Sequence, residues 1–508
     1  MTASNPSRLI SRRSLLGGAA LASAGLAAAR WPASAEPLTS LLAPVGTPVA
    51  MVDQLVLDLS SEPANLDPAT TYEVNGWSII HSIYDSLVQY DASGKLQGVA
   101  AESLTQTDPL TWAAKLRAGM TFHDGAKVDA NAVIAGWRRI VNSQTSSIKG
   151  NFATIANIEA VDDVTAKITL SAPSPWLPAQ IALWLVLLPP NATDDSILKQ
   201  PIGSGPYSFV EWKPGEQITL QANPTYPSGS AKGQPIAKKA TFRFVAEPST
   251  RVADLLSGTA GVIRGVPVDQ QEPIAKGGAK VVAADISGTS FIRLPNDVAP
   301  FTDARVRQAL NYAIDKEGIV SALNGNLGKP LASFFPPGGL GYSADLQPFA
   351  YDPDKAKTLL KEAGVGEFQT TLEYASTERA DLSEAIAAQL SDVGVKATAK
   401  AVEVATFNAD WKNQSGAPLR YVSWRPMFDP YTLLFLMVSK DGYLSRFNSS
   451  TVQPLLDQAA VETDTAKRAD LYVQLAKALQ DDPAGIYLWS LTSIYGMAAS
   501  APAWPPRP

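Results

Sequence analysis

Residues 423–430 hold the densest set of side chains that could bind a small molecule. Arg425 stands between two aromatic residues, Trp424 and Phe428, and Asp429 follows before a proline. Arg425 could bind a carboxylate or phosphate through two parallel hydrogen bonds, or it could face solvent on an alternating strand. Asp429 could accept an ammonium group or cap a turn. Trp424 could form the wall of an enclosed site or belong to the core.

The histidine and cysteine content restricts catalysis and metal binding. The 508-residue chain has no cysteine and only two histidines, His81 and His123. Disulfides, zinc–thiolate sites, iron–sulfur clusters and a cysteine nucleophile are therefore excluded. Most pairs of nucleophile and base lack a member, and no HExxH, G-x-S-x-G, dinucleotide or phosphate-loop motif is present. The sequence predicts a protein that is not an enzyme, without a cofactor or a protein-held metal.

Length and composition indicate an ordered protein of several domains. A chain of 508 residues is too long for one compact core. Hydrophobic residues make up 45% and charged residues 18%, which is typical of a soluble globular protein. The 42 basic and 48 acidic residues give a modest negative balance, so we expect no nucleic-acid partner.

The first 35 residues have the three parts of an export signal. Arg12 and Arg13 precede a weakly hydrophobic run at residues 15–29, and A-S-A at residues 33–35 is a cleavage pattern. The paired arginines favour the twin-arginine route over the general secretory route. Residues 36–52 are predicted to be a linker. Because a lipid-anchored protein needs a cysteine, we expect a soluble periplasmic protein that is not a lipoprotein.

Strands and helices alternate along the rest of the chain. Among the predicted strands are residues 54–59, 111–116, 166–170, 207–212, 217–222, 240–245, 370–374 and 396–402. Among the predicted helices are residues 75–89, 129–141, 249–257, 303–322, 381–393 and 464–480, and another that begins at Asp352-Pro353 and stops at Gly364. This alternation predicts an α/β protein with mainly parallel strand pairing.

Five segments, in order, resemble the signature segments of family 5 extracellular solute-binding proteins, which bind dipeptides, oligopeptides or nickel chelates. They are MTFHDG at 120–125, PIGSGPY at 201–207, PFTDARVRQALNYAID at 300–315, YDPDKAKTLLKEAG at 351–364 and WRPMFDP at 424–430. The third segment is the most specific. The resemblance covers residues 55–489, which is nearly the whole chain after the predicted signal.

The resemblance implies a two-lobed periplasmic-binding-protein fold of type II, with the extra subdomain of the peptide/nickel class. Such lobes close around a small-molecule or short-peptide ligand. The implied partners are an ABC permease pair with its ATPases, and a monomer is expected. The implied division is a first lobe of residues 53–96, 201–292 and 487–508, an extra subdomain of residues 97–200 and a second lobe of residues 293–486.

The last signature segment departs from the peptide-binding pattern. Peptide binders of the family carry W-x-x-D-x-x-D-P, whose first aspartate holds the peptide ammonium, but this chain has Met427 there. The spacing is closer to the nickel-chelate branch, which places ligand-facing side chains at Tyr72 and Trp77, although Trp77 could equally be core. The ligand-binding residues expected from the segment and the resemblance are Tyr72, Trp77, Trp424, Arg425, Phe428 and Asp429.

The expected function is capture of a small peptide-like or conjugated amino-acid solute for import. A nickel-chelate binder of the same family is one alternative, although nickel favours imidazole ligands and no histidine follows Pro430. A receptor that presents its ligand for chemotaxis or sensing is another. At residue 261, where the family usually has an aspartate that leads a strand, this chain has glycine. The strand that follows carries Arg264, to which the resemblance assigns no role.

Overall fold

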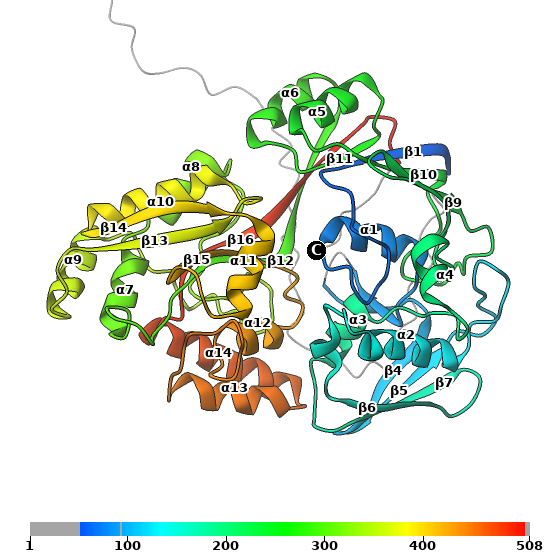
Figure 1. Ribbon diagram of the computed structural model, residues 1–508, viewed down its shortest axis with the longest axis horizontal. Coiled ribbons are helices and arrows are strands. Elements are labelled where there is room, and N and C mark those ends of the chain that lie inside the picture. Colours follow the sequence, from blue (N-terminus) through cyan, green and yellow to red (C-terminus); the bar gives the residue numbers. More distant parts are fainter. Residues whose placement is uncertain (1–50, 92–93, 503–508) are drawn as a thin grey trace, which may run out of the picture.

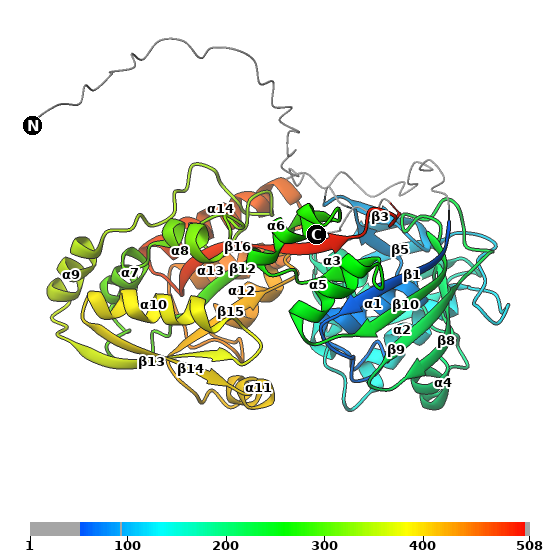
Figure 2. The same ribbon diagram turned by 90° about the horizontal axis from the view of Figure 1, so that it is seen from above.

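The computed structural model describes residues 51–91 and 94–502 and has two lobes side by side (Figure 1). The predicted export signal and residues 36–50 of the predicted linker lie outside the described residues. Two long strands, β12 (Lys280–Arg293) and β16 (Gly485–Met497), run from one lobe into the other (Figure 2). Within the described ranges, no helix is long and apolar enough to cross a membrane.

A mixed ten-stranded sheet continues through both lobes. From one edge to the other its strands are β14 (Val395–Val402), β13 (Phe368–Ala375), β15 (Leu419–Trp424), β12, β16, β11 (Val262–Arg264), β1 (Val52–Leu59), β10 (Ala237–Phe244), β9 (Gln217–Ala222) and β8 (Tyr207–Lys213). We call the side with β1 and β8–β11 the first lobe and the side with β13–β15 the second lobe.

The prediction of mainly parallel pairing is wrong. In the described part of the chain, β1 is parallel to β10 and β11, and β13 is parallel to β14 and β15, whereas the other ladders are antiparallel. Strands β8, β9 and β10 form an antiparallel meander, and the return of β16 beside β12 adds another antiparallel pair. The alternation of strands and helices along the sequence does not show which neighbouring strands run antiparallel.

A second sheet belongs to the first lobe. Its strands, in order, are β4 (Ala101–Asp108), β5 (Thr111–Leu116), β7 (Thr165–Leu170) and β6 (Ile155–Ala160), and a small hairpin joins β2 (Val88–Tyr90) to β3 (Leu96–Gly98). One hydrophobic core, with buried members from Leu59 to Phe242, extends from this sheet to β9 and β10. The sheet therefore shares its core with the rest of the first lobe.

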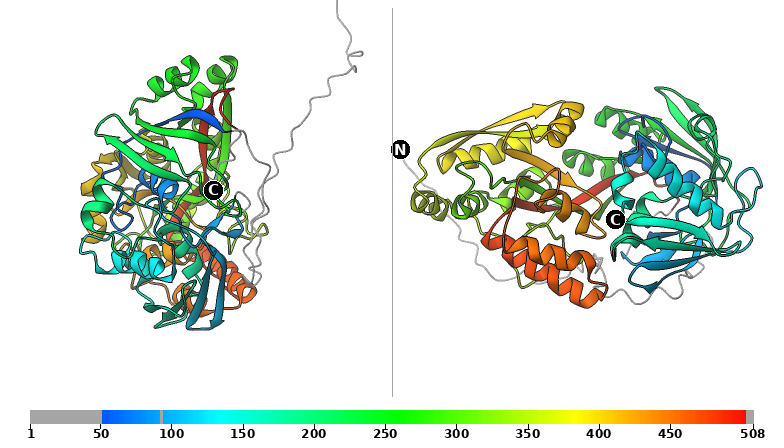
Figure 3. Two further views of the ribbon diagram at one scale, coloured as in Figure 1. Left: turned by 90° about the vertical axis from the view of Figure 1, so that its right-hand side faces the viewer. Right: turned by 60° about the horizontal axis from the view of Figure 1, so that its bottom comes forward.

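Helices cover the sheets in both lobes. In the first lobe they are α1 (Val74–Ile83), α2 (Ala130–Asn142), α3 (Leu177–Trp184), α4 (Asp194–Lys199), α5 (Pro248–Ser257) and α6 (Gln271–Lys276). In the second lobe they are α7 (Ala304–Tyr312), α8 (Lys316–Leu323), α9 (Pro353–Glu362), α10 (Ala380–Asp392), α11 (Val404–Lys412), α12 (Tyr431–Met437), α13 (Val452–Val461) and α14 (Thr465–Asp481). The pair α13 and α14 and the four-stranded sheet lie toward the same side of the molecule (Figure 3).

Side-chain caps explain where several predicted helices begin. Asp129 accepts a hydrogen bond from Asn131 N at 2.9 Å, and Asp352 accepts one from Lys355 N at 2.8 Å. These bonds satisfy backbone donors that have no partner inside the helix. At the other end of α5, Gly258 adopts the left-handed conformation (φ 80°) that glycine tolerates best. The predicted starts of α2 and α9 are confirmed.

Two predicted helices differ from the structure. The single helix predicted at 303–322 is two helices, because the Asp315 side chain accepts a hydrogen bond from Gly318 N at 2.8 Å and starts α8 anew. The helix predicted at 75–89 ends at Ile83, and its last residues form β2 instead. Just beyond that end, the buried Asp85 forms an ion pair of 3.0 Å with Lys232. Tertiary contacts there outweigh the apolar periodicity.

The PIGSGPY segment packs against the end of α1. Gly205 N donates a hydrogen bond to Ile83 O at 2.8 Å. A Cβ atom on Gly203 would lie only 2.0 Å from the same oxygen, so the close approach of the two backbones requires glycine. This signature segment is structural and fixes α1, the helix that follows Tyr72.

Candidate ligand-binding site

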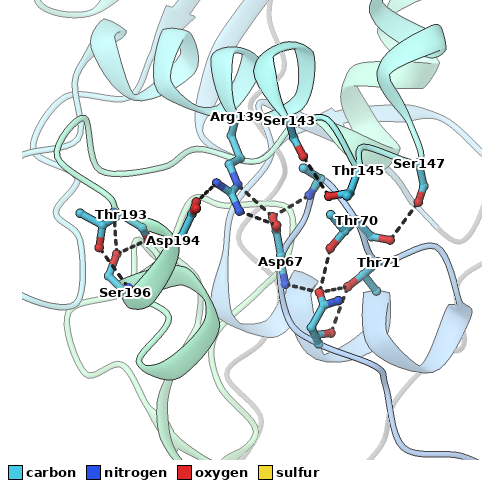
Figure 4. A network of polar contacts seen from close by, with 12 residues as sticks. Asp67, Thr70, Thr71, Arg139, Ser143, Thr145, Ser147, Thr193, Asp194 and Ser196 are labelled. Atoms are coloured by element: carbon cyan, nitrogen blue, oxygen red, sulfur yellow. Dashed lines mark hydrogen bonds and ion pairs between the residues drawn. The ribbon is translucent and has the colours of Figure 1, made fainter.

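The loop before α1 is held rigidly by polar contacts (Figure 4). The side-chain oxygen of Asn65 accepts hydrogen bonds from Asp67 N and from the Thr70 and Thr71 hydroxyls at 2.9–3.0 Å. The buried Asp67 carboxylate binds Arg139 of α2, with Oδ2 to Nη2 at 2.6 Å and Oδ1 to Nε at 3.2 Å. A two-point carboxylate–guanidinium contact fixes orientation as well as position. These contacts therefore fix the loop segment that leads to Tyr72.

Tyr72 is the outermost member of an aromatic stack in the first lobe. Its ring stacks on Trp184 with centroids 5.5 Å apart, and Trp184 meets Trp77 edge-on at 4.9 Å. Trp77 is 6% exposed, and its indole N–H donates to Thr71 O at 2.9 Å. Tyr72 is 54% exposed. Trp77 thus packs at the buried end of the aromatic stack, and Tyr72 forms its solvent-exposed end.

Tyr72 lies within electrostatic range of Tyr443 in the second lobe. Burial by the surrounding protein raises the pKa of Tyr72 to about 12, and Tyr443 of the second lobe contributes to the rise. Burial also raises the pKa of Tyr443, which is 51% exposed. Tyr72 and Tyr443 both keep exposed surface, although burial by the surrounding protein raises the pKa of each.

Arg425 reaches the inter-lobe region from the second lobe. It follows directly after Trp424, the half-buried last residue of β15, which is paired with Thr289 of β12. Arg425 is exposed and forms no hydrogen bond or ion pair with any other described residue. Desolvation lowers the pKa of Arg425, and the positive charge of Arg264 in the first lobe lowers it further. Among the described residues, Arg425 therefore has no ion-pair partner.

Glu378 is the acidic side chain of the second lobe that interacts with Arg425. It lies in the turn between β13 and α10, and its carboxylate accepts a hydrogen bond from the Ser423 hydroxyl at 3.2 Å. Burial raises the pKa of Glu378, while Ser423 and Arg425 lower it. Nothing in the sequence singles out Glu378, because its neighbours in space are remote in the chain.

Asp429 is already bound by protein groups. Its carboxylate receives Nη1 and Nη2 of the buried Arg468 at 2.5 and 2.9 Å, and it also accepts a hydrogen bond from Tyr431 N at 3.0 Å. The residue two positions earlier, Met427, is 2% exposed and belongs to a hydrophobic core. The position where peptide binders of the family carry an amine-binding aspartate is therefore apolar and closed to solvent.

Phe428 takes part in direct contacts between the lobes. It stacks on Tyr90 of the first lobe with centroids 4.0 Å apart. Nearby, Trp176 stacks on Tyr431 at 5.0 Å, and Gln180 Nε2 donates to the Thr432 hydroxyl at 3.1 Å. We call these three pairs the lobe contact. They join α3 and β2 of the first lobe to the start of α12.

The predicted site residues thus divide by environment. Tyr72 and Arg425 are accessible from the two lobes, Trp77 and Asp429 support them from inside, Trp424 is half-buried and Phe428 is in the lobe contact. The residues around them that the prediction did not include are Trp184, Arg264, Glu378 and Tyr443. Their contacts connect segments that are far apart in the sequence.

The two histidines are engaged in the scaffold. His81 Nε2 lies 3.1 Å from Leu183 O, and His123 contacts the backbone of Gly203 and Gly205. Among the residues for which coordinates are described, no cluster of three or more histidines and acids could hold a metal ion.

A cavity beside Tyr84 has a volume of about 80 Å³. That is well below the roughly 300–1,000 Å³ typical of ligand sites.

Comparison with known proteins identifies the family. Residues 95–445 match the model of bacterial extracellular solute-binding proteins, family 5 Middle. The chain belongs to this family. It is 30% identical over 436 residues to the glutathione-binding protein GsiB of Salmonella paratyphi A, covering 82% of this chain and 83% of the relative. It is 28% identical over 471 residues to the probable D,D-dipeptide-binding periplasmic protein DdpA of Escherichia coli, covering 88% and 90% of the two chains.

Solved structures agree with this assignment. The structure of the binding protein AgaA from A. tumefaciens in complex with agropinic acid superposes with a TM-score of 0.75 and 26% identity, covering 88% of this chain and 93% of that chain. The expected family and its two-lobed α/β fold are confirmed. As a member of this family, the protein is the substrate-binding component of an ABC importer and not an enzyme.

Proposed function

We propose that the protein is a periplasmic receptor that captures a small peptide-like or conjugated amino-acid solute between its lobes. The observation that carries the proposal is the pairing of an exposed aromatic residue on one lobe, Tyr72, with an unneutralised arginine on the other, Arg425. Enclosed small-molecule sites combine aromatic walls with a few polar anchors. A ligand that is both apolar and anionic would contact the two lobes together.

The proposed division into parts follows the shared strands. The first lobe comprises residues 53–96, 201–292 and 487–508, the extra subdomain residues 97–200 and the second lobe residues 293–486. Strands β12 and β16 supply the hinge, and the pairing of these strands shifts between Asp285 and Thr289. A bulge at the crossing lets a strand bend. In this proposal the lobes rotate about the hinge while each keeps its own core.

Closure is a shift of population toward the closed form. The ligand favours that form because it contacts both lobes only there. A micromolar ligand supplies about 8 kcal/mol of binding free energy, which can outweigh the strain of a hinge. The lobe contact formed by Phe428, Trp176 and Gln180 with their partners adds protein–protein contacts at the mouth of the site.

The relatives support an amino-acid-derived ligand. Their names refer to glutathione, a D,D-dipeptide and agropinic acid. The first two carry at least one carboxylate and the third is an acid by name, which matches an exposed arginine better than a metal chelate does. We propose the ligand-binding set Tyr72, Trp77, Trp424, Arg425, Phe428 and Asp429, with Tyr72 and Arg425 in direct contact and the others supporting the site.

The proposal extends to export and assembly. The paired arginines of residues 1–35 would direct the folded protein through the twin-arginine route, and the absence of cysteine leaves no site for lipidation. The mature monomer would deliver its ligand to a permease pair driven by ATPases. Replacing Arg12 and Arg13 by lysine should abolish export, and export that continues unchanged would indicate the general secretory route.

A melting-temperature panel tests the proposed function. The mature protein is refolded to remove any bound ligand and mixed with glutathione, D-alanyl-D-alanine, agropinic acid or nickel with histidine. A ligand at 100 times its Kd stabilises a protein by about 2.7 kcal/mol, which raises Tm by several degrees. We expect an amino-acid-derived compound to raise Tm. A response to nickel with histidine alone, or no response to any of the four, would contradict the proposal.

A further inference from the structure

The lobe contact is a second connection between the lobes, because none of its residues belongs to the crossing strands β12 and β16. In Figure 1, α3 and α12 lie on the facing sides of the two lobes. The ring planes of Tyr90 and Phe428 are 10° apart, and those of Trp176 and Tyr431 are 15° apart. Stacked aromatic pairs contribute free energy beyond the area that they bury. Both pairs therefore favour the arrangement in which the lobes touch.

Trp176 and Gln180 of the first lobe are buried at this contact. Trp176 is 6% exposed and Gln180 is 4% exposed. Trp176 stacks on Tyr431, and Gln180 donates to the hydroxyl of Thr432, so both meet residues of α12. Separation of the lobes would return the facing sides of these side chains to water. The loss of apolar ring surface from water adds to the free energy that keeps the lobes together.

A buried ion pair of the second lobe fixes the two rings that this lobe contributes. Asp429 follows Phe428 in the chain and accepts a hydrogen bond from Tyr431 N at 3.0 Å. Both terminal nitrogens of the Arg468 guanidinium bind its carboxylate. Burial raises the pKa of Tyr90, and the charge of Asp429 raises it further, so the first lobe reaches close to this ion pair. The rings meet a rigid support.

Gln180 limits the strength of the contact. Its amide oxygen is buried and has no hydrogen-bond partner among the described residues. A buried polar atom without a partner disfavours the state in which it is buried. The stacked rings thus favour contact of the lobes, whereas this oxygen opposes it. Such a balance suits a contact that forms and breaks repeatedly.

We propose that the lobe contact is a latch that stabilises the closed form of the receptor before a ligand binds. The inference rests on the hinge proposed above and goes beyond it, because part of the closing free energy comes from protein groups instead of the ligand. A fraction of the receptor is then closed without ligand. The apparent Kd falls as this fraction rises, by the same factor for every ligand. Phe428 and Asp429 of the WRPMFDP segment serve closure.

Distances between spin labels test the latch without a ligand. The chain has no cysteine, so Val161→Cys in the first lobe and Val461→Cys in the second, at side chains 61% and 49% exposed, carry the only labels. Double electron–electron resonance on the refolded mature protein gives the distance between them. We expect Trp176→Ala or Phe428→Ala to lower the ratio of closed to open receptor by about 2- to 10-fold. Thr432→Val, which removes only the acceptor hydroxyl, should lower it less.

Tyr351→Ala is the matched control. It removes an aromatic side chain that is 48% exposed and takes no part in the lobe contact, so the distances should not change.

The outcomes separate the latch from the proposed function. A labelled protein that shows only the open distance, or latch variants that leave the distances unchanged, would overturn the latch. No ligand enters this measurement, so a panel in which no compound binds would contradict the proposed function alone. The melting temperature of each variant shows whether it has folded, and Phe428→Leu takes the place of Phe428→Ala if the latter does not fold.

Discussion

Arg425 and Asp429 belong to one short segment, yet their environments are opposite. Asp429 is bound by a buried guanidinium on one side and a backbone N–H on the other, whereas Arg425 is exposed and unpaired among the described residues. The first lobe repeats the contrast, with buried Trp77 behind exposed Tyr72. In each lobe, one residue of the proposed site is structural and a nearby one is exposed. Substitution of the buried residue in each lobe should therefore lower stability, whereas substitution of the exposed residue should weaken ligand binding.

The largest effect is expected from Asp429→Ala. The change leaves Arg468, whose side chain is 5% exposed, without its acid. Removing one partner of a buried ion pair typically destabilises a protein by about 3–5 kcal/mol. Denaturant unfolding of the mature protein measures the loss. The matched control is Glu272→Ala, because the Glu272–Lys276 pair is exposed and should contribute well under 1 kcal/mol.

Arg425→Gln should have the opposite profile. An exposed, unpaired side chain contributes little to folding, so stability should stay within about 0.5 kcal/mol. Binding of an acidic ligand should weaken by about 1.5–3 kcal/mol, because a charged hydrogen-bond donor is lost. Unfolding and titration of the same preparation give both values. A loss of stability as large as that of Asp429→Ala would show that Arg425 belongs to the scaffold.

Trp77→Phe tests the contrast in the first lobe. The smaller ring loses packing against Trp184 and the hydrogen bond to Thr71 O, so we expect a loss of stability of about 1–2 kcal/mol. Tyr72→Ala should change stability less, because Tyr72 is 54% exposed, but should weaken ligand binding. If Tyr72→Ala binds every ligand of the panel as the wild type does, the aromatic wall is not part of the site.

The sequence predicted the fold better than the site. Signature segments identified the family, and local chemistry predicted starts such as Asp129 and Asp352, because caps act within a few residues. The helix break at Asp315 was missed because an aspartate can also occupy a helix interior. Antiparallel returns were missed because strand order depends on contacts between distant segments.

The site was only partly predictable for a related reason. The residue types single out Arg425 as a polar group that could bind a carboxylate, but the sequence does not tell whether an acid pairs with it. The partner of Asp429 is Arg468, in a helix far along the chain. Glu378 lies in a turn that carries no recognisable sequence motif. Pairing in space decides which charged residues remain available to a ligand.

The most direct test of the account is a crystal structure of the mature protein with the panel compound that most raises its Tm. We predict the compound between the lobes, with a carboxylate against Arg425 and its apolar part against Tyr72. A compound that touches one lobe alone, or lies away from both residues, would contradict the account.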